Sequence, residues 1–282
     1  MVKEPKFRLG DLDFQIKFAA RNERLPQLLN CPKDLTRFVL NTPEPQSTAD
    51  HLIIELGSII TEDLVEIVTL CHNGFINGAM KILRGMFERT VTLIYLDQHP
   101  NEAEAFENYH YIDLYKIAAE LERIHPGKFL TREQFDEIKA KRDEVKEKYL
   151  VKCNCRKDCP EQHINVSWSK LGLVQMANAI GFKGDLLVFS YYGGIKETHP
   201  KMGAIYDRLK VRYGDSKEAD EKGAFGVAVY LMMEVIHAIK ERFKLDEIDE
   251  TYQECILLVK EMYKSVSIGF SNSPSSPLEP EL

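Results

Sequence analysis

The chain has 282 residues, 44% of them hydrophobic and 29% charged, which is enough apolar material for one large or two modest globular domains. A net charge of −7 disfavours a nonspecific nucleic-acid coat, because such a coat needs a basic face to release phosphate counterions. The N-terminal residues do not combine a basic segment with a following apolar run of signal-peptide length. The longest apolar stretches, such as residues 225–233, are too short and too interrupted to cross a bilayer on this pattern. We therefore expect a cytoplasmic protein with no membrane partner and with its six cysteines reduced.

Hydrophobic residues recur with helical period along most of the chain. The pattern predicts an N-terminal helical extension and linker at residues 1–47, a helical bundle domain at residues 48–266 and a disordered tail at residues 267–282. Within the bundle it predicts long helices near residues 48–71, 76–97, 101–124, 131–148, 218–242 and 249–264, and shorter ones near 170–180 and 184–195. No alternating β-rich run stands out. The predicted fold is all-α, a multi-helix bundle that is mainly one domain, with one Cys-rich loop at residues 152–165.

Several expected helices begin with residues that favour helix starts. Thr48 or Asp50 can cap the first long helix. Thr131, with Gln134 three residues later, has the spacing of a capping box, and Asn101 with Glu104 repeats that spacing before the third long helix.

The Cys-rich loop is the segment whose side chains point most directly to a chemistry. Its four soft potential ligands, Cys153, Cys155, Cys159 and His163, lie within eleven residues. Tetrahedral Cys₃His sites are common structural zinc sites, so zinc is the expected cofactor if the loop binds a metal. The usual zinc signature instead separates two ligand pairs by a dozen or more residues. An exposed loop with incidental cysteines is therefore the alternative.

A second metal chemistry is indicated by Glu-x-x-His spacings, which place a carboxylate and an imidazole on one helix face. The pairs are Glu107/His110, Glu122/His125 and Glu234/His237, and further carboxylates are available at Glu62, Glu66 and Glu88. Di-iron bundles use two such pairs and one glutamate from each of two other helices. Accidental spacing, or a hydrogen-bonded polar pair in the core, explains them equally well.

Arg84 and Glu88 lie four residues apart on the second long helix, between the apolar residues Leu83 and Phe87. Such a pair adds little on a solvated face, but a partly buried charge must be paired or functional, because desolvation costs several kcal/mol. An ion pair that braces the bundle is the structural alternative to a catalytic role. Nucleophile and phosphate-loop motifs are absent, and Gly193-Gly194 predicts a helix-breaking turn.

The segment Ile82-Leu-Arg-Gly-Met-Phe-Glu-Arg-Thr, with the downstream Leu93-Ile-Tyr-Leu and the helix expected from residue 101 to 115, resembles a prokaryotic all-helical family known only as a domain of unknown function. In that family a Trp, a tyrosine-rich turn and a His follow. Their counterparts here are Trp168, Tyr191-Tyr192 and His199-Pro200, so the resemblance covers roughly residues 50 to 240. The chain departs from the family at Gly193-Gly194-Ile195, where the family tends to carry a Ser.

A looser likeness is to RNA-binding helical bundles of toxin–antitoxin and phage-defence systems, whose ribonuclease members use an Arg-x(4–6)-His motif on a helix. Here that spacing occurs from Arg156 to His163, inside the Cys-rich loop and interrupted by a proline. The likeness implies instead one internal polar site, with Arg84, Glu88, Tyr192 and His199 as candidate catalytic residues. In it, His199 would transfer a proton and Arg84 would bind the phosphate.

Three functions therefore stay open from the sequence. The first is an RNA-directed or phage-defence-type module built on the Arg/Glu/His site. The second is a non-catalytic scaffold with a zinc-pinned Cys-rich loop, which would bind a protein partner or form a homodimer. The third is a di-iron carboxylate protein. The sequence does not decide between enzyme and scaffold.

Overall fold

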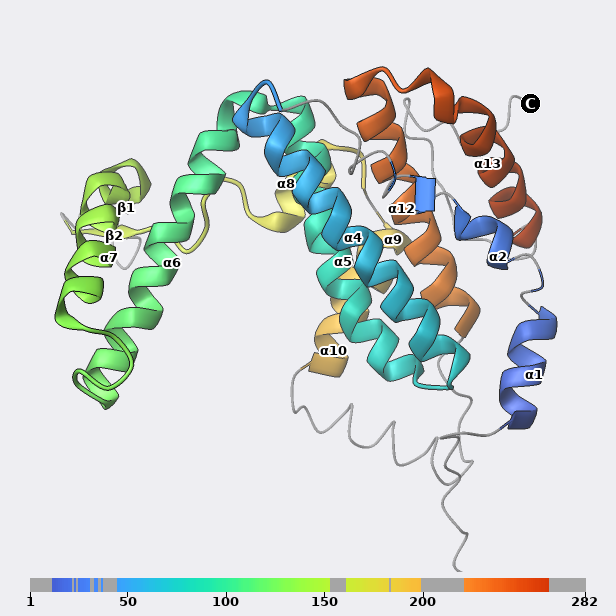
Figure 1. The fold of residues 1–282 in the computed structure, drawn as a ribbon, viewed down its shortest axis with the longest axis horizontal. Helices are drawn as coiled ribbons and strands as arrows, with labels where there is room; N and C mark the ends of the chain where they lie inside the picture. The colour runs from blue at the N-terminus through green and yellow to red at the C-terminus, as the bar shows by residue number, and fades with distance from the viewer. Residues whose placement is uncertain are drawn as a thin grey trace, which may run out of the picture. The chain divides into compact units, whose positions relative to one another are not determined.

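The structure is a computed structural model that describes residues 12–21, 23, 25–30, 33–34, 37, 45–152, 161–182, 184–198 and 221–263 (Figure 1). The described residues are 81% helical, so the all-α prediction is confirmed. The chain divides into two compact units, residues 1–98 with 173–282 and residues 99–172. We call them the bundle unit and the middle unit and describe each by itself. The domain bounds expected near residues 47 and 266 stay a prediction.

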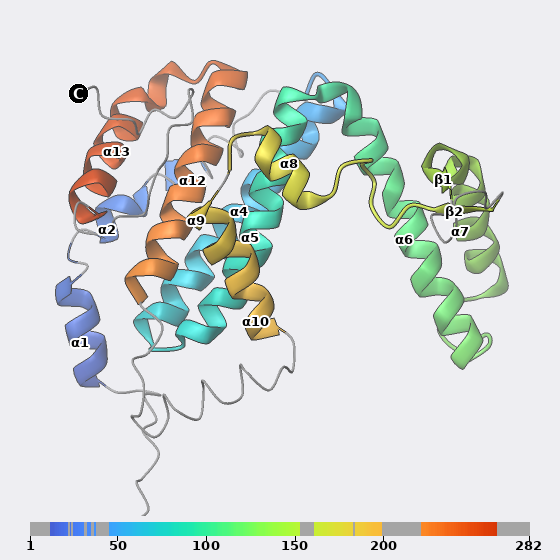
Figure 2. The ribbon, with the colours of Figure 1, turned by 180° about the vertical axis from the view of Figure 1, so that it is seen from behind.

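All regular elements in the described residues of the bundle unit are helical (Figures 1 and 2). Its elements are α1 (Leu12–Arg21), α2 (Leu25–Leu28), α4 (Thr48–His72), α5 (Ile76–Gln98), α8 (Leu173–Ala179), α9 (Asp185–Leu187), the π-helical turn η3 (Val188–Gly193), α10 (Gly194–Thr198), α12 (Glu221–Phe243), the 3₁₀ turn η4 (Asp246–Ile248) and α13 (Asp249–Tyr263).

The core of this unit lies where α4, α5 and α12 pack pairwise against one another. Ile60 of α4, Phe87 of α5 and Leu231 of α12 are fully buried there. The apolar positions of α4 and α5 recur every three or four residues, which gives each helix a stripe that must find a partner. These stripes meet α12, whose ten residues from 224 to 233 are all buried.

Within α12, the stretch Gly223–Phe243 is long and apolar enough to cross a membrane by length and composition. The expectation that no segment reaches this length is therefore wrong. In the structure, 78% of the apolar window is buried inside the protein. A helix that is apolar on every side suits the centre of a large core as well as a bilayer.

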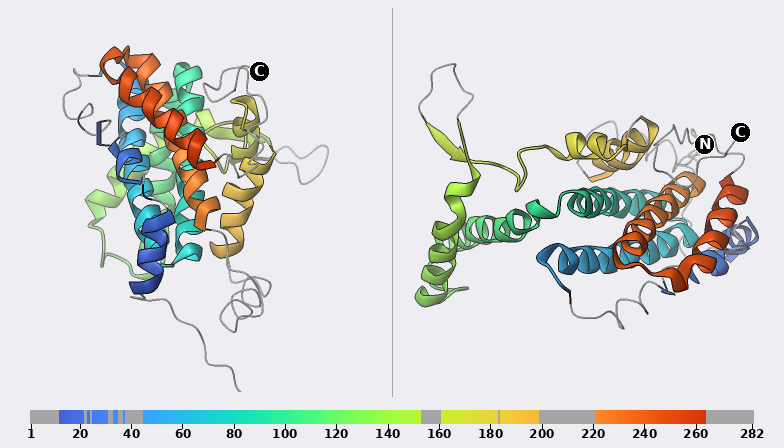
Figure 3. Two further views of the ribbon diagram at one scale, coloured as in Figure 1. Left: turned by 90° about the vertical axis from the view of Figure 1, so that its right-hand side faces the viewer. Right: turned by 90° about the horizontal axis from the view of Figure 1, so that it is seen from above.

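The middle unit contains the 3₁₀ turn η1 (Pro100–Glu102), α6 (Ala103–Ile124), α7 (Arg132–Val145), the 3₁₀ turn η2 (Lys146–Tyr149), β1 (Leu150–Lys152) and β2 (Gln162–Ile164). The two strands pair antiparallel, with Val151 opposite His163 (Figure 3). Tyr109, Ile112, Val145 and Tyr149 form a small core. The two tyrosine rings meet edge to face at 5.1 Å, and both hydroxyls donate to backbone carbonyls.

Helix starts test the capping predictions directly. Thr131 and Gln134 form the predicted capping box at the start of α7. The cap of α4 is Ser47, one residue before the expected Thr48, and its hydroxyl accepts a hydrogen bond from the backbone N–H of Asp50. The Asn101 prediction is wrong, because Pro100 begins a 3₁₀ turn and α6 starts only after it.

Two described cysteines lie in the core of the bundle unit. Cys71 is buried in α4 and forms no disulfide, whereas Cys255 is buried in α13 and is disulfide-bonded. The expectation of reduced cysteines is therefore confirmed at Cys71 and wrong at Cys255. Cytoplasmic location stays a prediction.

A polar aromatic pair lies between α12 and α13. The ring of His237 stacks on that of Tyr252, with centroids 6.0 Å apart and an interplanar angle of 15°. Neither His237 Nδ1 nor the Tyr252 hydroxyl has a hydrogen-bond partner among the described residues. Burial lowers the pKa of His237 below its ordinary value, against the opposing effect of Glu241. The neutral imidazole is thus the form that the fold favours.

This pair gives a pH prediction for stability. A base whose pKa is lower in the folded state adds stability above its ordinary pKa of 6.5 and loses it as pH falls through the folded value. We expect His237→Phe to retain the stacking and to raise the free energy of unfolding at pH 5 by on the order of 1 kcal/mol, since it removes an unpaired buried nitrogen. Urea unfolding at pH 8 and pH 5 measures this, with exposed His110→Gln as control. An unchanged pH dependence in His237→Phe would refute the assignment.

Candidate functional site

The segment after α9 contains a π-helical turn, Val188–Gly193, which leads directly into α10. Both elements pack on α5 (Figure 2). A π-turn widens the helix by one residue per turn and occurs often at functional sites. The sequence predicted an ordinary short helix here and a break at Gly193-Gly194. That break is wrong, because Gly194 has helical dihedral angles of −63° and −39°.

The two glycines are explained by close approach to α5. A side chain at Gly194 would place its Cβ 2.5 Å from Arg84 Cβ and 3.0 Å from the carbonyl oxygen of Met80. At Gly193 the nearest atom would be Met80 Cε, at 3.0 Å. The serine expected from the family resemblance would collide with α5 at Gly194. The glycines therefore set the distance between α10 and Arg84.

Arg84 is held on three sides by this arrangement. Its Nε donates to Glu88 Oε1 at 2.8 Å, and its Nη1 donates to Thr198 Oγ1 at 3.1 Å. The Thr198 hydroxyl donates in turn to the carbonyl of Ile195, which fixes its position. The guanidinium carbon lies 5.4 Å from the centroid of the Tyr191 ring, within cation–π range.

Tyr192 completes what we call the Arg84 site, made of Arg84, Glu88, Tyr191, Tyr192 and Thr198. The Tyr192 ring packs edge to face on Tyr191 at 5.2 Å, yet 51% of the residue is exposed. The side chains of Arg84 and Glu88 are 24% and 39% exposed. The site is therefore half-open to solvent and not sealed within the bundle.

The structure sorts the candidate catalytic residues as follows. Arg84 and Glu88 are joined by a direct hydrogen bond, and Tyr192 lies beside them through Tyr191. His199 lies outside the described residues. Tyr191 and Thr198 contact Arg84 directly and were not predicted. The Tyr-Tyr pair was visible in the sequence, but only the π-turn decides which ring faces the arginine.

The chemistry available at the Arg84 site is recognition of an anion. The hydrogen bonds to Glu88 and Thr198 use Nε and Nη1, so the Nη2 donors have no partner within the described part of the chain. A guanidinium that is fixed by neighbours loses little rotamer entropy when it binds phosphate or carboxylate. Glu88 is the carboxylate that contacts Arg84, and this contact keeps the guanidinium paired when no ligand is bound.

Of the predicted zinc ligands, only His163 lies within the described residues. It is exposed on β2, in register with Val151. Cys153, Cys155 and Cys159 lie outside the described residues, so the zinc prediction stays a prediction.

The glutamates and histidines of the di-iron hypothesis are all described. They fall in both units, and no three metal-ligating side chains are grouped to hold an ion in the described part of the chain. His110 instead contacts the ring of Tyr111, and His237 stacks on Tyr252. No di-iron ligand group is therefore found among the described residues, and the di-iron hypothesis stays a prediction.

Comparison with known proteins gives one match. The family described as "Family of unknown function (DUF5677)" matches residues 50–217, more than half of the chain. No curated protein and no solved structure matches. The matched region includes α4, α5, α10 and the π-turn, and thus every element of the Arg84 site.

Substitution of Gly194 tests whether the close approach builds the site. We expect Gly194→Ala to lower the free energy of unfolding by about 1–3 kcal/mol, because its Cβ would overlap Arg84 and the α5 backbone. The matched control is Gly78→Ala on α5, where the nearest atoms lie at an ordinary 3.5 Å. There the better helix propensity of alanine should stabilise by up to about 1 kcal/mol. Equal effects of the two changes in urea unfolding would contradict this account.

Proposed function

The chain belongs to the DUF5677 family of unknown function, and we propose that it is an RNA-directed helical module whose Arg84 site binds the RNA backbone. The observation that carries the proposal is the fixed guanidinium of Arg84 over the ring of Tyr191, which in turn contacts the half-exposed ring of Tyr192. The looser likeness to RNA-binding helical bundles agrees with it. A net charge of −7 means that binding must depend on such a local site and not on a general basic surface.

Arg84 supplies the phosphate contact. Its bonds to Glu88 and Thr198 set the guanidinium plane before any ligand arrives. Hydrogen bonds to charged groups contribute about 1.5–3 kcal/mol each, more than neutral ones. A preset donor therefore contributes affinity without the entropy loss of a free surface arginine.

Tyr192 supplies a surface for a base. Its ring is supported from one side by Tyr191, and half of the residue remains open to solvent. Stacking of a base on an aromatic side chain contributes roughly 1–3 kcal/mol and tolerates any sequence. Arginine beside an exposed tyrosine thus matches single-stranded RNA better than a duplex, whose bases are already stacked.

Binding to a fluorescent single-stranded RNA oligonucleotide, measured by anisotropy, tests the proposal. We expect Arg84→Ala to weaken binding by at least about tenfold, from the loss of a charged hydrogen bond, and Tyr192→Ala to weaken it similarly. The control is Arg132→Ala. This change removes an exposed i,i+4 ion pair between Arg132 and Asp136, both on α7, which is not part of the Arg84 site. No binding by the native protein, or an Arg84 variant that behaves like the control, would reject the function.

A nuclease assay on the same RNA separates binding from catalysis. If the site cleaves, His199 is the expected proton-transfer group and Arg84 the phosphate ligand. Both His199→Ala and Arg84→Ala should then abolish cleavage, while only Arg84→Ala reduces affinity. Cleavage that survives both changes would exclude this site as a nuclease and leave the binding role to the anisotropy result.

A second candidate function is a zinc-pinned scaffold for a protein partner or a homodimer. The observation that favours it is the pairing of β1 with β2, in which Lys152 lies opposite Gln162. These residues directly flank the cysteine segment, so the ends of that segment are held together by the strand pair. Such a frame lowers the loop-closure cost of gathering ligands that are close in sequence.

Elemental analysis of tag-free protein tests the zinc proposal. We expect about one zinc per chain, and loss of it in the Cys153→Ala/Cys155→Ala double variant. Cys71→Ala is the matched control, because this cysteine is buried in the bundle unit and lies outside the Cys-rich loop. A native protein without zinc, or equal zinc in both variants, would refute the metal-bound scaffold.

A further inference from the structure

The middle unit contains a groove of about 370 Å³ to which α6, α7 and β2 all contribute. Its apolar lining comes from Ile112, which is buried, and from the half-buried Ala119 and Ile164. Its charged lining consists of the cations Lys116, Arg123 and Arg142 and the carboxylate Glu120. We call it the Arg142 groove. It shares no residue with the Arg84 site.

The charges around Arg142 do not balance locally. A single oxygen, Oδ1 of Asp143, accepts from Arg142 Nη1 at 2.6 Å and from Lys146 Nζ at 2.7 Å. Hydrogen bonds from Lys146 and Arg142 lower the pKa of the Asp143 carboxyl, so it is ionised at neutral pH. Two cations thus share one carboxylate, which leaves a surplus positive charge at the wall of the groove.

The other two cations differ in how completely they are paired. Arg123 forms a two-bond contact with Glu120, at 2.6 and 2.8 Å, and is neutralised by it. Lys116 bonds Asp113 at 2.8 Å and reaches the Tyr109 hydroxyl at 3.3 Å. Its side chain is 53% exposed, so it can turn toward a ligand in the groove.

Arg142 also has an unused hydrogen-bond donor. Its Nε is buried and has no partner among the described residues. Its guanidinium lies over the ring of Tyr115, with 4.7 Å between the guanidinium carbon and the ring centroid. A buried donor without a partner is rare in native proteins and costs about 1–3 kcal/mol. Because this Nε is enclosed in the protein, a ligand acceptor would reach it only through a shift of the Arg142 side chain.

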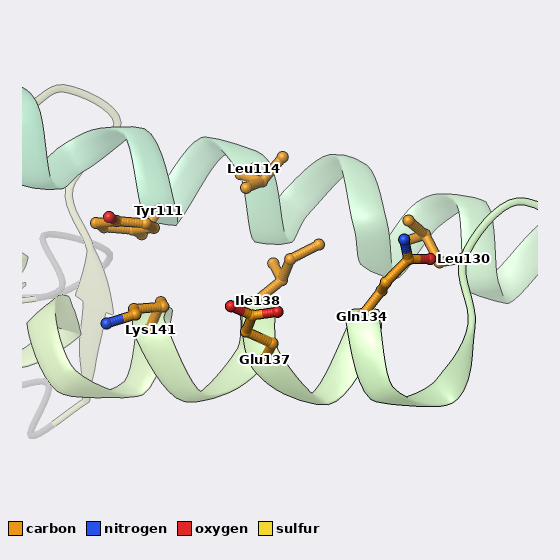
Figure 4. A pocket seen from close by; sticks show the side chains of 7 residues that line it. All are labelled: Tyr111, Leu114, Leu130, Gln134, Glu137, Ile138 and Lys141. Atoms are coloured by element: carbon orange, nitrogen blue, oxygen red, sulfur yellow. The ribbon is translucent and has the colours of Figure 1, made fainter.

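A second hollow of the same unit shows what is distinctive here. It has a similar volume of about 360 Å³, and its walls include Tyr111 and Leu114 of α6 and Ile138 of α7 (Figure 4). Its one lining cation, Lys141, pairs with Glu144 at 3.8 Å, and the carboxylate Glu137 also lines the hollow. Size and apolar walls are thus shared by both hollows, while excess positive charge and an unpaired donor belong to the Arg142 groove.

We infer that the Arg142 groove binds a mononucleotide, with the phosphate at Arg142 and Lys116 and the base against Ile112, Ala119 and Ile164. The phosphate would satisfy the surplus charge and the open hydrogen-bonding capacity of Arg142, since guanidinium groups suit phosphate oxygens. The planar base would cover the apolar lining. The volume lies at the low end of small-molecule sites and fits one nucleotide unit, not a duplex.

Titration calorimetry of the full chain with adenosine 5′-monophosphate tests the inference. We expect binding that is weakened about tenfold or more by Arg142→Ala or Lys116→Ala, through loss of a charge-assisted contact. Adenosine, which lacks the phosphate, should bind at least about tenfold more weakly for the same reason. Arg132→Ala is the matched control, because Arg132 also lies on α7 over an aromatic ring, that of Phe135, but does not line the groove.

Further variants and competing ligands distinguish the possible outcomes. If Arg142→Ala loses its cooperative unfolding transition, the exposed Lys116→Ala variant carries the test instead. No binding by the native protein at millimolar nucleotide, equal binding of adenosine, or groove variants equal to Arg132→Ala would each overturn the inference. Competition by a 5′-phosphorylated RNA, but not by its 5′-hydroxyl form, would identify an RNA end as the source of the nucleotide. Competition by neither would identify the free nucleotide.

This inference stands apart from the proposed function. Any binding of adenosine monophosphate at the Arg84 site would be lost in Arg84→Ala, whereas the binding that depends on Arg142 should be retained in that variant, because the groove shares no residue with the Arg84 site. Failure of RNA binding at Arg84 and failure of nucleotide binding at Arg142 are therefore separate results.

Discussion

Burial of α12 against α4 and α5 is the constraint on which the bundle unit depends. A helix with ten consecutive buried residues cannot leave any face in water, so its neighbours must surround it. α5 therefore turns Leu83 and Phe87 inward, and both are fully buried. The same helix leaves Arg84 and Glu88 at its edge, where η3 and α10 pack. The position of the polar site is a consequence of how the apolar core is closed.

The Arg84 site depends on a close helix approach. Gly194 lets α10 lie against α5 at a separation that no side chain at that position would allow. The π-turn before it carries the two tyrosines, and it directs Tyr191 to the arginine while Tyr192 remains half-exposed. The guanidinium is thus oriented by packing and by one neutral hydrogen-bond partner, Thr198, as well as by the carboxylate of Glu88. Such orientation before binding is what distinguishes a recognition site from a surface ion pair.

The middle unit is organised differently, because it has little apolar core and a highly charged surface. Its buried cluster consists of two tyrosines and two aliphatic residues, and the hydroxyls of the tyrosines are bonded to backbone carbonyls. Most of its ion pairs are exposed i,i+3 or i,i+4 contacts that contribute little to stability. Arg142 differs from these residues, because its side chain is only 22% exposed and it shares its carboxylate with Lys146. The surplus positive charge of this group of side chains therefore lies at Arg142 and Lys146.

The sequence by itself determined the all-α class, the approximate extent of the long helices, the capping box at Thr131 and the pairing of Arg84 with Glu88. These features are local, since each depends on residues three or four apart along one helix. Other features were decided only by the tertiary structure. Pro100 displaced the expected cap at Asn101, the glycine pair stayed helical because α5 lies against it, and Tyr191 and Thr198 met Arg84 across more than a hundred residues of chain. The surplus charge at Arg142 and the burial of α12 likewise arise from packing between segments, which the spacing of residues within one helix does not encode.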